Sequence, residues 1–251
     1  MNNTALVLGG GGAKGAYHIG AIKALHELGF KYNIVTGTSI GSLIALILAC
    51  DNFNKLEEIW KEISFETIIK HKYILKDKLL ETLIFAPFCK GFSIEPLEKL
   101  VKKHINEDKA RNSNIKTGIV ITKKGKKYFP VTIDEIPYNE LHNYLLTSCS
   151  AFPFFKKRKI NNELCYDGFY SDNLPVKLAM DMGASKIIAI EIKKGYRKKT
   201  DTKSINYLHI KPSKRICASF NFNYKKTDIA MQLGYNDIMN KKEKILEFIN
   251  K

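Results

Sequence analysis

Residues 34–49 read IVTGTSIGSLIALILA. In this stretch Gly37, Ser39 and Gly41 form a Gly-x-Ser-x-Gly motif between the apolar pair Ile34-Val35 and a long apolar run. The context predicts a strand, a sharp turn and a helix, an arrangement that exposes a serine hydroxyl on a strained backbone. Glycines on either side of the serine avoid the collision that side chains would cause where strand meets helix. The motif therefore indicates a nucleophilic serine at residue 39.

A second glycine-rich element, residues 10–15, reads GGGAKG and lies between an expected strand at 4–9 and an expected helix at 13–29. Its Gly-x-Gly-x-x-Gly spacing also occurs in dinucleotide-binding loops, but the acidic residue that such sites need after the next strand is replaced by Val35-Thr36-Gly37. A nucleotide phosphate loop is excluded because Lys14 is followed by Gly15 and not by Ser or Thr. Free backbone N–H groups at a helix N-terminus favour negative charge. Beside a nucleophilic serine, they predict an oxyanion hole.

Composition indicates one soluble, intracellular domain spanning residues 1–251. The chain is 45% hydrophobic, which suffices for a full core, and no apolar stretch is long enough to span a bilayer. Its start, Met1-Asn2-Asn3-Thr4, does not resemble a signal peptide and leads straight into a strand. The five cysteines include no Cys-x-x-Cys pair, so we expect reduced thiols without a disulfide framework or zinc site.

A formal charge of +16 arises from 41 basic and 25 acidic residues, and implies attraction to polyanions. The alternative is a uniformly solvated lysine-rich surface. Two basic clusters, 156–159 and 193–199, stand out, but no zinc-finger or RNA-recognition signature accompanies them. We therefore expect a phospholipid surface as the partner and no nucleic acid.

The order of predicted elements gives an α/β fold. Strand 4–9, helix 13–28, strand 33–36 and the helix after Ser39 form a strand-helix-strand unit with parallel strands, which puts both glycine loops at one sheet edge. Residues 51–112 are mostly helical with a break at 85–92, and we expect them to form a cap over the site. A hairpin is predicted at 116–122 and 127–133, a helix at 138–149, strands at 186–192 and 206–211, and one closing helix at about 228–250.

A serine needs a base, and two partners fit the sequence. The serine, acid, histidine order of nucleophile-elbow hydrolases permits Ser39, Asp167 and His209. In that class, however, the elbow follows several strands rather than the second, and His209 sits in the strand-like Tyr207-Leu208-His209-Ile210. The other option is a carboxylate acting directly on Ser39, for which Asp167 in the sequence Asp167-Gly168 is the natural candidate and Asp172 the competing acid.

The ordered set Gly-Gly-Gly-x-Lys-Gly, Gly-x-Ser-x-Gly and Asp-Gly followed by Asn-x-Pro (Asn173-Leu174-Pro175) resembles the patatin-like phospholipase family of serine lipid acyl hydrolases. The resemblance runs from Leu6 to about Ile192, and more loosely through Gly234-Tyr235. It implies a three-layer α/β/α fold with a central, mostly parallel sheet. It also implies a Ser-Asp dyad, with Ser39 as nucleophile and Asp167 as general base and acid, an oxyanion loop at Gly10, Gly11 and Gly12, and supporting motif residues Lys14, Gly15, Gly37, Gly41 and Gly168.

One position departs from the family. Phe169 stands where the family usually has Gly or Ala after Asp-Gly, and we expect the larger side chain to narrow the site.

The expected function is hydrolysis of carboxylic esters of membrane lipids, of phospholipase A type, through an acyl-enzyme and without metal or other cofactor. The alternatives are a serine esterase, thioesterase or acyltransferase acting on small acyl groups, and a non-catalytic anionic-lipid-binding protein. Aromatic segments 85–88 and 152–155 next to Lys90 and the 156–159 cluster suit peripheral anchoring at an anionic membrane. Packing in the core is the alternative role of these aromatic residues.

Overall fold

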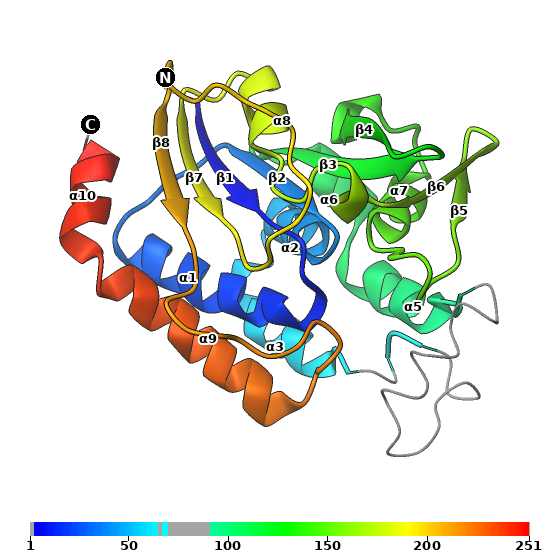
Figure 1. Cartoon of the computed structure of the whole chain (residues 1–251), viewed down its shortest axis with the longest axis horizontal. Coiled ribbons are helices and arrows are strands. Elements are labelled where there is room, and N and C mark those ends of the chain that lie inside the picture. The colour runs from blue at the N-terminus through cyan, green and yellow to red at the C-terminus, as the bar shows by residue number, and fades with distance from the viewer. Residues whose placement is uncertain (1–2, 65–66, 70–90, 251) are drawn as a thin grey trace.

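The computed structural model describes residues 3–64, 67–69 and 91–250 and shows a central sheet flanked by helices (Figure 1). Its strands are β1 (Thr4–Leu8), β2 (Ile34–Thr38), β3 (Lys116–Lys123), β4 (Lys127–Thr132), β5 (Arg158–Ile160), β6 (Glu163–Asp167), β7 (Lys186–Ile190) and β8 (Asn206–Ile210). Its α-helices are α1 (Ala16–Glu27), α2 (Ile40–Ala49), α3 (Leu56–Glu62), α5 (Glu95–His104), α6 (Glu107–Arg111), α7 (Leu141–Ser148), α8 (Val176–Asp181), α9 (Tyr224–Met239) and α10 (Lys242–Asn250). Short 3-10 turns are η1 (Gly12–Gly15), η2 (Phe53–Lys55), η4 (Ile133–Glu135) and η5 (Gly168–Tyr170).

The eight strands form one sheet in the order β5-β6-β3-β2-β1-β7-β8, with β4 paired to β3. Strands β3, β2, β1, β7 and β8 are parallel, whereas β4, β5 and β6 add antiparallel pairs at one side. The predicted α/β fold with a central, mostly parallel sheet is confirmed. The predicted hairpin is confirmed as well, since β3 and β4 pair antiparallel from Gly118 to Lys123.

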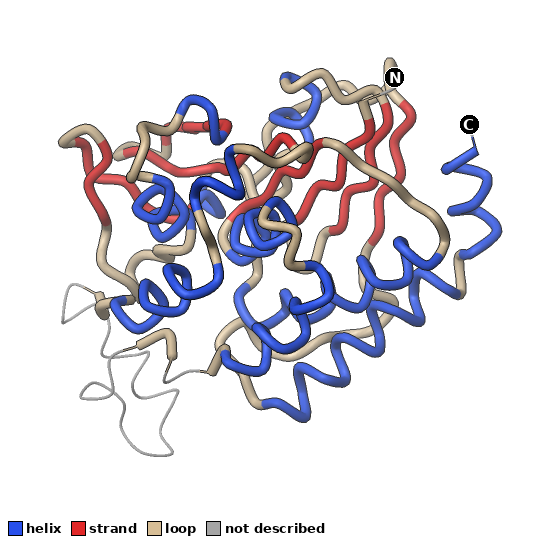
Figure 2. The backbone as a smooth tube through the Cα atoms, turned by 180° about the vertical axis from the view of Figure 1, so that it is seen from behind, coloured by secondary structure: helices blue, strands red, loops and turns tan. Residues whose placement is uncertain are grey.

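Alternation along the buried strands sends side chains to two separate cores. In β1, Leu6 and Leu8 join the large core with α1 and α2, while Ala5 and Val7 pack with α8 on the opposite face. These layers on the two faces of the sheet match the expected α/β/α arrangement. Seen from behind, α9 runs alongside α1 across the larger layer (Figure 2).

The register of β3 explains how the chain brings two distant motifs together. Along one edge of β3, β2 pairs as far as Thr38 opposite Val120, and β6 then takes over with Asp167 opposite Ile121. The other edge of β3 is occupied by β4 over the same residues. Strands β2 and β6 therefore meet end to end, so the residue after Thr38 lies beside Asp167.

Two expectations differ from the structure. The prediction of a single closing helix is wrong. The structure has two helices there, α9 and α10, separated by a tight turn at Asn240-Lys241. Residues 240–244 carry no apolar side chain for a continuous buried face, and the turn lets Ile245 and Phe248 reach the core. The β5–β6 hairpin was not expected at all.

Part of the expected helical cap lies within the described residues as α3, α5 and α6. The segment 70–90, including most of the expected break at 85–92 and the aromatic segment 85–88 beside Lys90, lies outside the described residues. Within the described part of the chain, no helix has the length and apolar character needed to cross a bilayer.

Candidate active site

Ser39 lies at the junction of β2 and α2, at the predicted sharp turn. Its backbone has φ 56° and ψ −125°, a conformation that a non-glycine residue adopts only when its surroundings enforce it. A Cβ atom on Gly37 would lie 2.3 Å from the Gly41 carbonyl oxygen, and one on Gly41 would lie 2.1 Å from the Leu8 oxygen. Both motif glycines are thus required by close backbone approach, as the sequence predicts.

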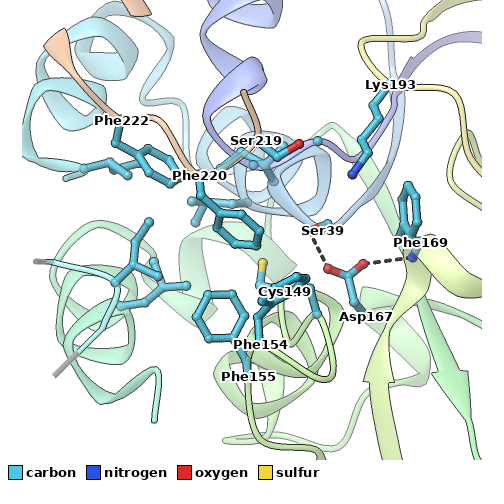
Figure 3. A pocket seen from close by; sticks show the side chains of 18 of the residues that line it. Ser39, Cys149, Phe154, Phe155, Asp167, Phe169, Lys193, Ser219, Phe220 and Phe222 are labelled. Atoms are coloured by element: carbon cyan, nitrogen blue, oxygen red, sulfur yellow. Dashed lines mark hydrogen bonds between the residues drawn. The ribbon is translucent and has the colours of Figure 1, made fainter. Parts of the chain in front are cut away.

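The Ser39 hydroxyl is bound directly to a carboxylate. Its Oγ donates a hydrogen bond to Asp167 Oδ2 at 2.7 Å, and the Phe169 N–H donates to Asp167 Oδ1 at 2.8 Å (Figure 3). Asp167 ends β6 and is only 2% exposed. Gly168 follows it at a point where a Cβ would lie 2.3 Å from the Val120 oxygen, so the Asp-Gly pair fits closely against β3.

Burial raises the pKa of Asp167 from 3.8 to about 7, against the opposing effects of the Phe169 N–H, the Ser39 hydroxyl and the Lys193 ammonium. A carboxylate whose pKa lies near neutrality can both accept and return a proton at pH 7. The site therefore holds a serine hydroxyl in direct contact with a carboxylate that can exchange a proton near neutral pH.

Neither competing partner contacts Ser39. His209 bonds Glu191 Oε2 at 3.2 Å and faces Arg197 at 3.5 Å, so its described partners lie outside the serine site. Asp172 is buried, and its Oδ1 accepts from the Leu174 N–H. Of the three candidate partners, Asp167 is the one in contact with Ser39.

The glycine loop after β1 presents two N–H groups without an acceptor among the described residues, those of Gly11 and Gly12. Both residues line the cavity that contains Ser39. The Gly10 N–H is already used, because it donates to the backbone oxygen and to Oδ1 of Asn173, both at 3.1 Å. Of the three glycines of the expected oxyanion loop, Gly11 and Gly12 are thus the two whose N–H groups are available as donors.

Several neighbours hold this loop in place. Gly12 has φ +59°, and the next residue, Ala13, donates its N–H to the Ser219 oxygen at 2.7 Å. Gly15 packs against Ile40 and Trp60, leaving no room for a Cβ. The side chain of Lys14 points to a different pocket, which it lines, so its contribution to the loop is the backbone bond from its N–H to the Gly11 oxygen at 3.4 Å.

An apolar cavity of about 120 Å³ opens beside Ser39 and Asp167. The expected aromatic segment contributes Phe154 and Phe155, and Phe220 packs against both, with ring centroids 4.9 and 6.1 Å away (Figure 3). Phe222 also lines the cavity. The loop before α9 therefore forms part of the cavity wall, a role that the sequence did not reveal because this loop carries no motif.

Lys193 is a site residue that sequence reasoning assigned to a surface cluster. It lines the same cavity as Ser39 and Asp167, and its Nζ lies 4.6 Å from the ring centroid of Phe169. Burial lowers the pKa of Lys193, and the positive charge of Lys14 adds to this, whereas Asp167 opposes it. Phe169, which departs from the family pattern, thus packs against a cation and lines the cavity beside Asp167.

Two further residues, Ser148 and Asn173, connect Ser39 and the glycine loop to neighbouring elements. Ser148 on α7 accepts a hydrogen bond from the Ser39 N–H at 3.1 Å and donates to the Val120 oxygen at 2.7 Å. Asn173 joins two loops, since its Nδ2 donates to the Gly10 oxygen at 3.3 Å and to the Lys193 oxygen at 2.8 Å. Asn173 belongs to the Asn-x-Pro motif, which could have marked it; Ser148 has no such signal.

Comparisons with known proteins found a matching family model and several similar proteins. The family model described as Patatin-like phospholipase matches residues 6–180. Human patatin-like phospholipase domain-containing protein 6 is 29% identical over 207 residues, which cover 80% of this chain and 14% of that protein. The chain thus spans about one seventh of the length of this relative.

Solved structures show the same fold. VipD from Legionella pneumophila has a TM-score of 0.59 at 16% identity, covering 97% of this chain and 67% of that one. Human GIVD cytosolic phospholipase A2 has a TM-score of 0.56 at 10% identity, covering 99% of this chain and 58% of that one.

Proposed function

Because the chain belongs to the patatin-like phospholipase family, we propose that it is a lipid acyl hydrolase that cleaves carboxylic esters through Ser39 and Asp167. The observation that carries the proposal is the 2.7 Å hydrogen bond from Ser39 Oγ to the buried Asp167 carboxylate, at the side of an apolar cavity. Neither a binding protein nor a structural protein needs a strained serine paired with a carboxylate of raised pKa.

The reaction follows from these positions. Asp167 accepts the Ser39 proton while Oγ attacks the ester carbonyl carbon, and the oxygen that becomes negative is held by the N–H groups of Gly11 and Gly12. Protonated Asp167 gives its proton to the departing alkoxide oxygen, leaving an acyl group on Ser39. Asp167 then takes a proton from water as the water oxygen attacks the acyl carbonyl carbon. When the bond from that carbon to Ser39 Oγ breaks, Asp167 returns the proton to Oγ, so the carboxylic acid leaves and the serine is restored.

The cavity indicates the substrate's acyl side. It is lined mainly by apolar side chains, including Leu43, Leu97 and Phe220, which suit a hydrocarbon chain. The human relative is named as a phospholipase domain-containing protein, which supports lipids as the substrate class. We infer cleavage of phospholipase A type. The small cavity volume of about 120 Å³ favours, as the second candidate, an esterase, thioesterase or acyltransferase acting on short acyl groups.

The test is acyl release from mixed phospholipid vesicles and from a short-chain ester by wild type, Ser39→Ala, Asp167→Asn and His209→Ala. We expect losses of about a thousandfold or more for the first two variants, because each removes a reacting group. His209→Ala is the matched control and keeps near wild-type rates.

The outcomes separate the alternatives. Activity on the ester but not on vesicles supports the esterase. Equal loss in His209→Ala supports the histidine triad, and a wild type inactive on both substrates supports the binding protein.

A further inference from the structure

A second pocket lies next to the catalytic cavity and is strongly basic. It measures about 630 Å³, and we call it the basic pocket; it is lined by Lys14, Lys193, Lys194, Arg197, Lys214 and Arg215. These side chains come from the loops that follow β1, β7 and β8, three adjacent parallel strands. The basic pocket is therefore assembled by the fold from segments far apart in sequence, at the sheet edge where open α/β proteins bind ligands.

Its positive charge is largely uncompensated. Glu191 is the pocket's carboxylate, and it is already engaged by Arg197, by His209 at 3.2 Å and by Lys211 at 3.4 Å. Within the described residues, Lys14, Lys193, Lys194, Lys214 and Arg215 form no ion pair. Cations gathered in this way repel one another, and a bound anion relieves that repulsion.

The walls of the basic pocket are fixed at two points. On the β8–α9 loop, the Ser213 N–H donates to Asp237 Oδ2 of α9 at 2.8 Å, directly before Lys214. On the β7–β8 loop, the Lys193 carbonyl oxygen accepts from Asn173 Nδ2 at 2.8 Å. These two hydrogen bonds fix the backbone next to Lys214 and at Lys193. The cations of the basic pocket are therefore carried by loops that are bound to the rest of the fold.

The basic pocket and the catalytic cavity meet at the glycine loop. Lys193 lines both of them. Gly11, one of the two available oxyanion donors, packs between Ile192 and Lys14, because a Cβ there would lie 3.0 Å from Ile192 Cδ1 and 3.4 Å from Lys14 Cβ. Ile192 and Lys14 also line the basic pocket. A molecule at Ser39 thus has apolar surroundings on one side of its ester and cations on the other.

We propose that the basic pocket binds the headgroup phosphate of the substrate, so that the enzyme prefers lipids with net anionic, phosphate-bearing headgroups over zwitterionic ones. The inference rests on the proposed lipid hydrolase function and names its substrate class. In a glycerophospholipid only a few bonds separate the scissile carbonyl from the phosphate, which matches adjacent apolar and basic pockets. Lysine and arginine donors suit phosphate oxygens, whereas a choline headgroup brings its own cation among them.

Monomeric dihexanoyl lipids test this preference without a membrane surface. Acyl release from phosphatidic acid and from phosphatidylcholine is measured for wild type, for Lys214→Gln/Arg215→Gln, and for the matched control Lys241→Gln/Lys242→Gln. The control removes the same charge from the α9–α10 junction, and neither of its two lysines lines the basic pocket.

For wild type we expect a lower KM for phosphatidic acid than for phosphatidylcholine. The Lys214→Gln/Arg215→Gln pair should raise the KM for phosphatidic acid about tenfold, the effect of losing charged hydrogen bonds, with little change for phosphatidylcholine. The control pair keeps the wild-type preference. Equal KM values in wild type, or equal effects of the two variant pairs, overturn the proposal while leaving the hydrolase intact.

Binding is measured separately by calorimetry in the Ser39→Ala background, with dihexanoyl phosphatidic acid and with inorganic phosphate as probes. Lipid binding that is lost on adding Lys214→Gln/Arg215→Gln supports the headgroup site even if wild type turns over no phospholipid, which is the result that would count against the proposed function. Binding of inorganic phosphate alone, without lipid, identifies an anion site unconnected with the substrate and overturns the proposal.

Discussion

Asp167 combines two properties that oppose each other. Its burial at the end of β6 brings it within 2.7 Å of Ser39 Oγ, and the same burial disfavours its charged form, raising the pKa from 3.8 to about 7. The ionised form of Asp167, which acts as base above pH 7, is therefore the form that destabilises the folded state. Functional sites often carry such a cost in stability.

Replacement by the neutral isostere makes this cost measurable. Below its folded pKa Asp167 takes up a proton, so its contribution to the free energy of unfolding falls as pH rises from about 4 to 7 and then levels off. We expect Asp167→Asn to melt several degrees above wild type at pH 8, with the difference shrinking as pH falls below 7; each kcal/mol corresponds to about 2–4 °C in a chain of this size.

Calorimetric melting of both proteins between pH 5 and 8 checks this. Asp201→Asn, at an exposed loop position, is the control and should follow the wild type. A melting temperature of Asp167→Asn equal to or below that of wild type at pH 8 contradicts the assigned pKa.

The residues of the candidate site differ in how far the sequence could predict them. Ser39, Asp167 and the glycine loop stand in short motifs. Four glycines of these motifs, at 12, 37, 41 and 168, are required by close backbone approach, since a Cβ on any of them would lie 2.1–2.3 Å from a backbone atom. Lys193 and Ser148 reach the site only through tertiary packing, and their neighbours in sequence gave no signal. Gly10 was predicted as a donor, but its N–H is taken by a side chain 163 residues away.

Glycines on both helices allow α1 and α9 to pack with their backbones in close contact. A Cβ on Gly20 would lie 1.8 Å from the Met231 oxygen, and one on Gly234 would lie 2.1 Å from the Tyr17 oxygen. The Tyr17 hydroxyl, one turn before Gly20, donates to Asp237 Oδ2 at 2.9 Å. This contact fixes α9, and with it the preceding loop that carries Phe220 and Ser219 over the active site.

We expect Gly234→Ala to force the two helix backbones apart. The cost of such overpacking is typically about 1–3 kcal/mol. Acyl release should fall as well, because the loop before α9 shifts with its helix. The measurements are thermal melting and hydrolysis of a short-chain ester, with exposed Gln232→Ala on the same helix as control. Wild-type stability and activity in Gly234→Ala would show that the helices have room to separate.

The β5–β6 hairpin shows why one element was missed. Its turn, Asn161-Asn162, has both residues at positive φ, 48° and 63°, a conformation that asparagine tolerates and that is typical of two-residue hairpin turns. The flanking strands are only three and five residues long and mix polar with apolar side chains, so their periodicity was too weak to detect. The parallel strands, by contrast, were predicted with ends within two residues of those observed.

For the molecule as a whole, the charge of +16 suggests adsorption to anionic lipid surfaces. Phe152 is 37% exposed, and Lys157 Nζ lies 4.2 Å from the centroid of its ring, which puts an aromatic side chain beside a cation at the surface. We propose this pair as one point of membrane contact. Phe154 and Phe155, by contrast, line the catalytic cavity.

Sedimentation with vesicles of rising anionic lipid content should remove increasing amounts of the protein from solution. About 0.5 M salt should reverse this, since it shortens the range of electrostatic attraction to a few ångströms. Lys156→Gln/Lys157→Gln should bind more weakly than Lys241→Gln/Lys242→Gln, which carries the same net charge. Binding that is indifferent to lipid charge and to salt would remove the electrostatic basis of the proposal.

The central claim is that Ser39 is a nucleophile activated by Asp167, and covalent labelling with an alkyl fluorophosphonate tests it most directly. Mass spectrometry should find one adduct, on the peptide containing Ser39, formed at a rate that rises with pH to a plateau with its midpoint near the pKa of about 7 of Asp167. Ser39→Ala should not react, Asp167→Asn should react at least about a hundredfold more slowly, and His209→Ala should match wild type. An adduct at another residue, or Asp167→Asn labelling at the wild-type rate, would contradict the account.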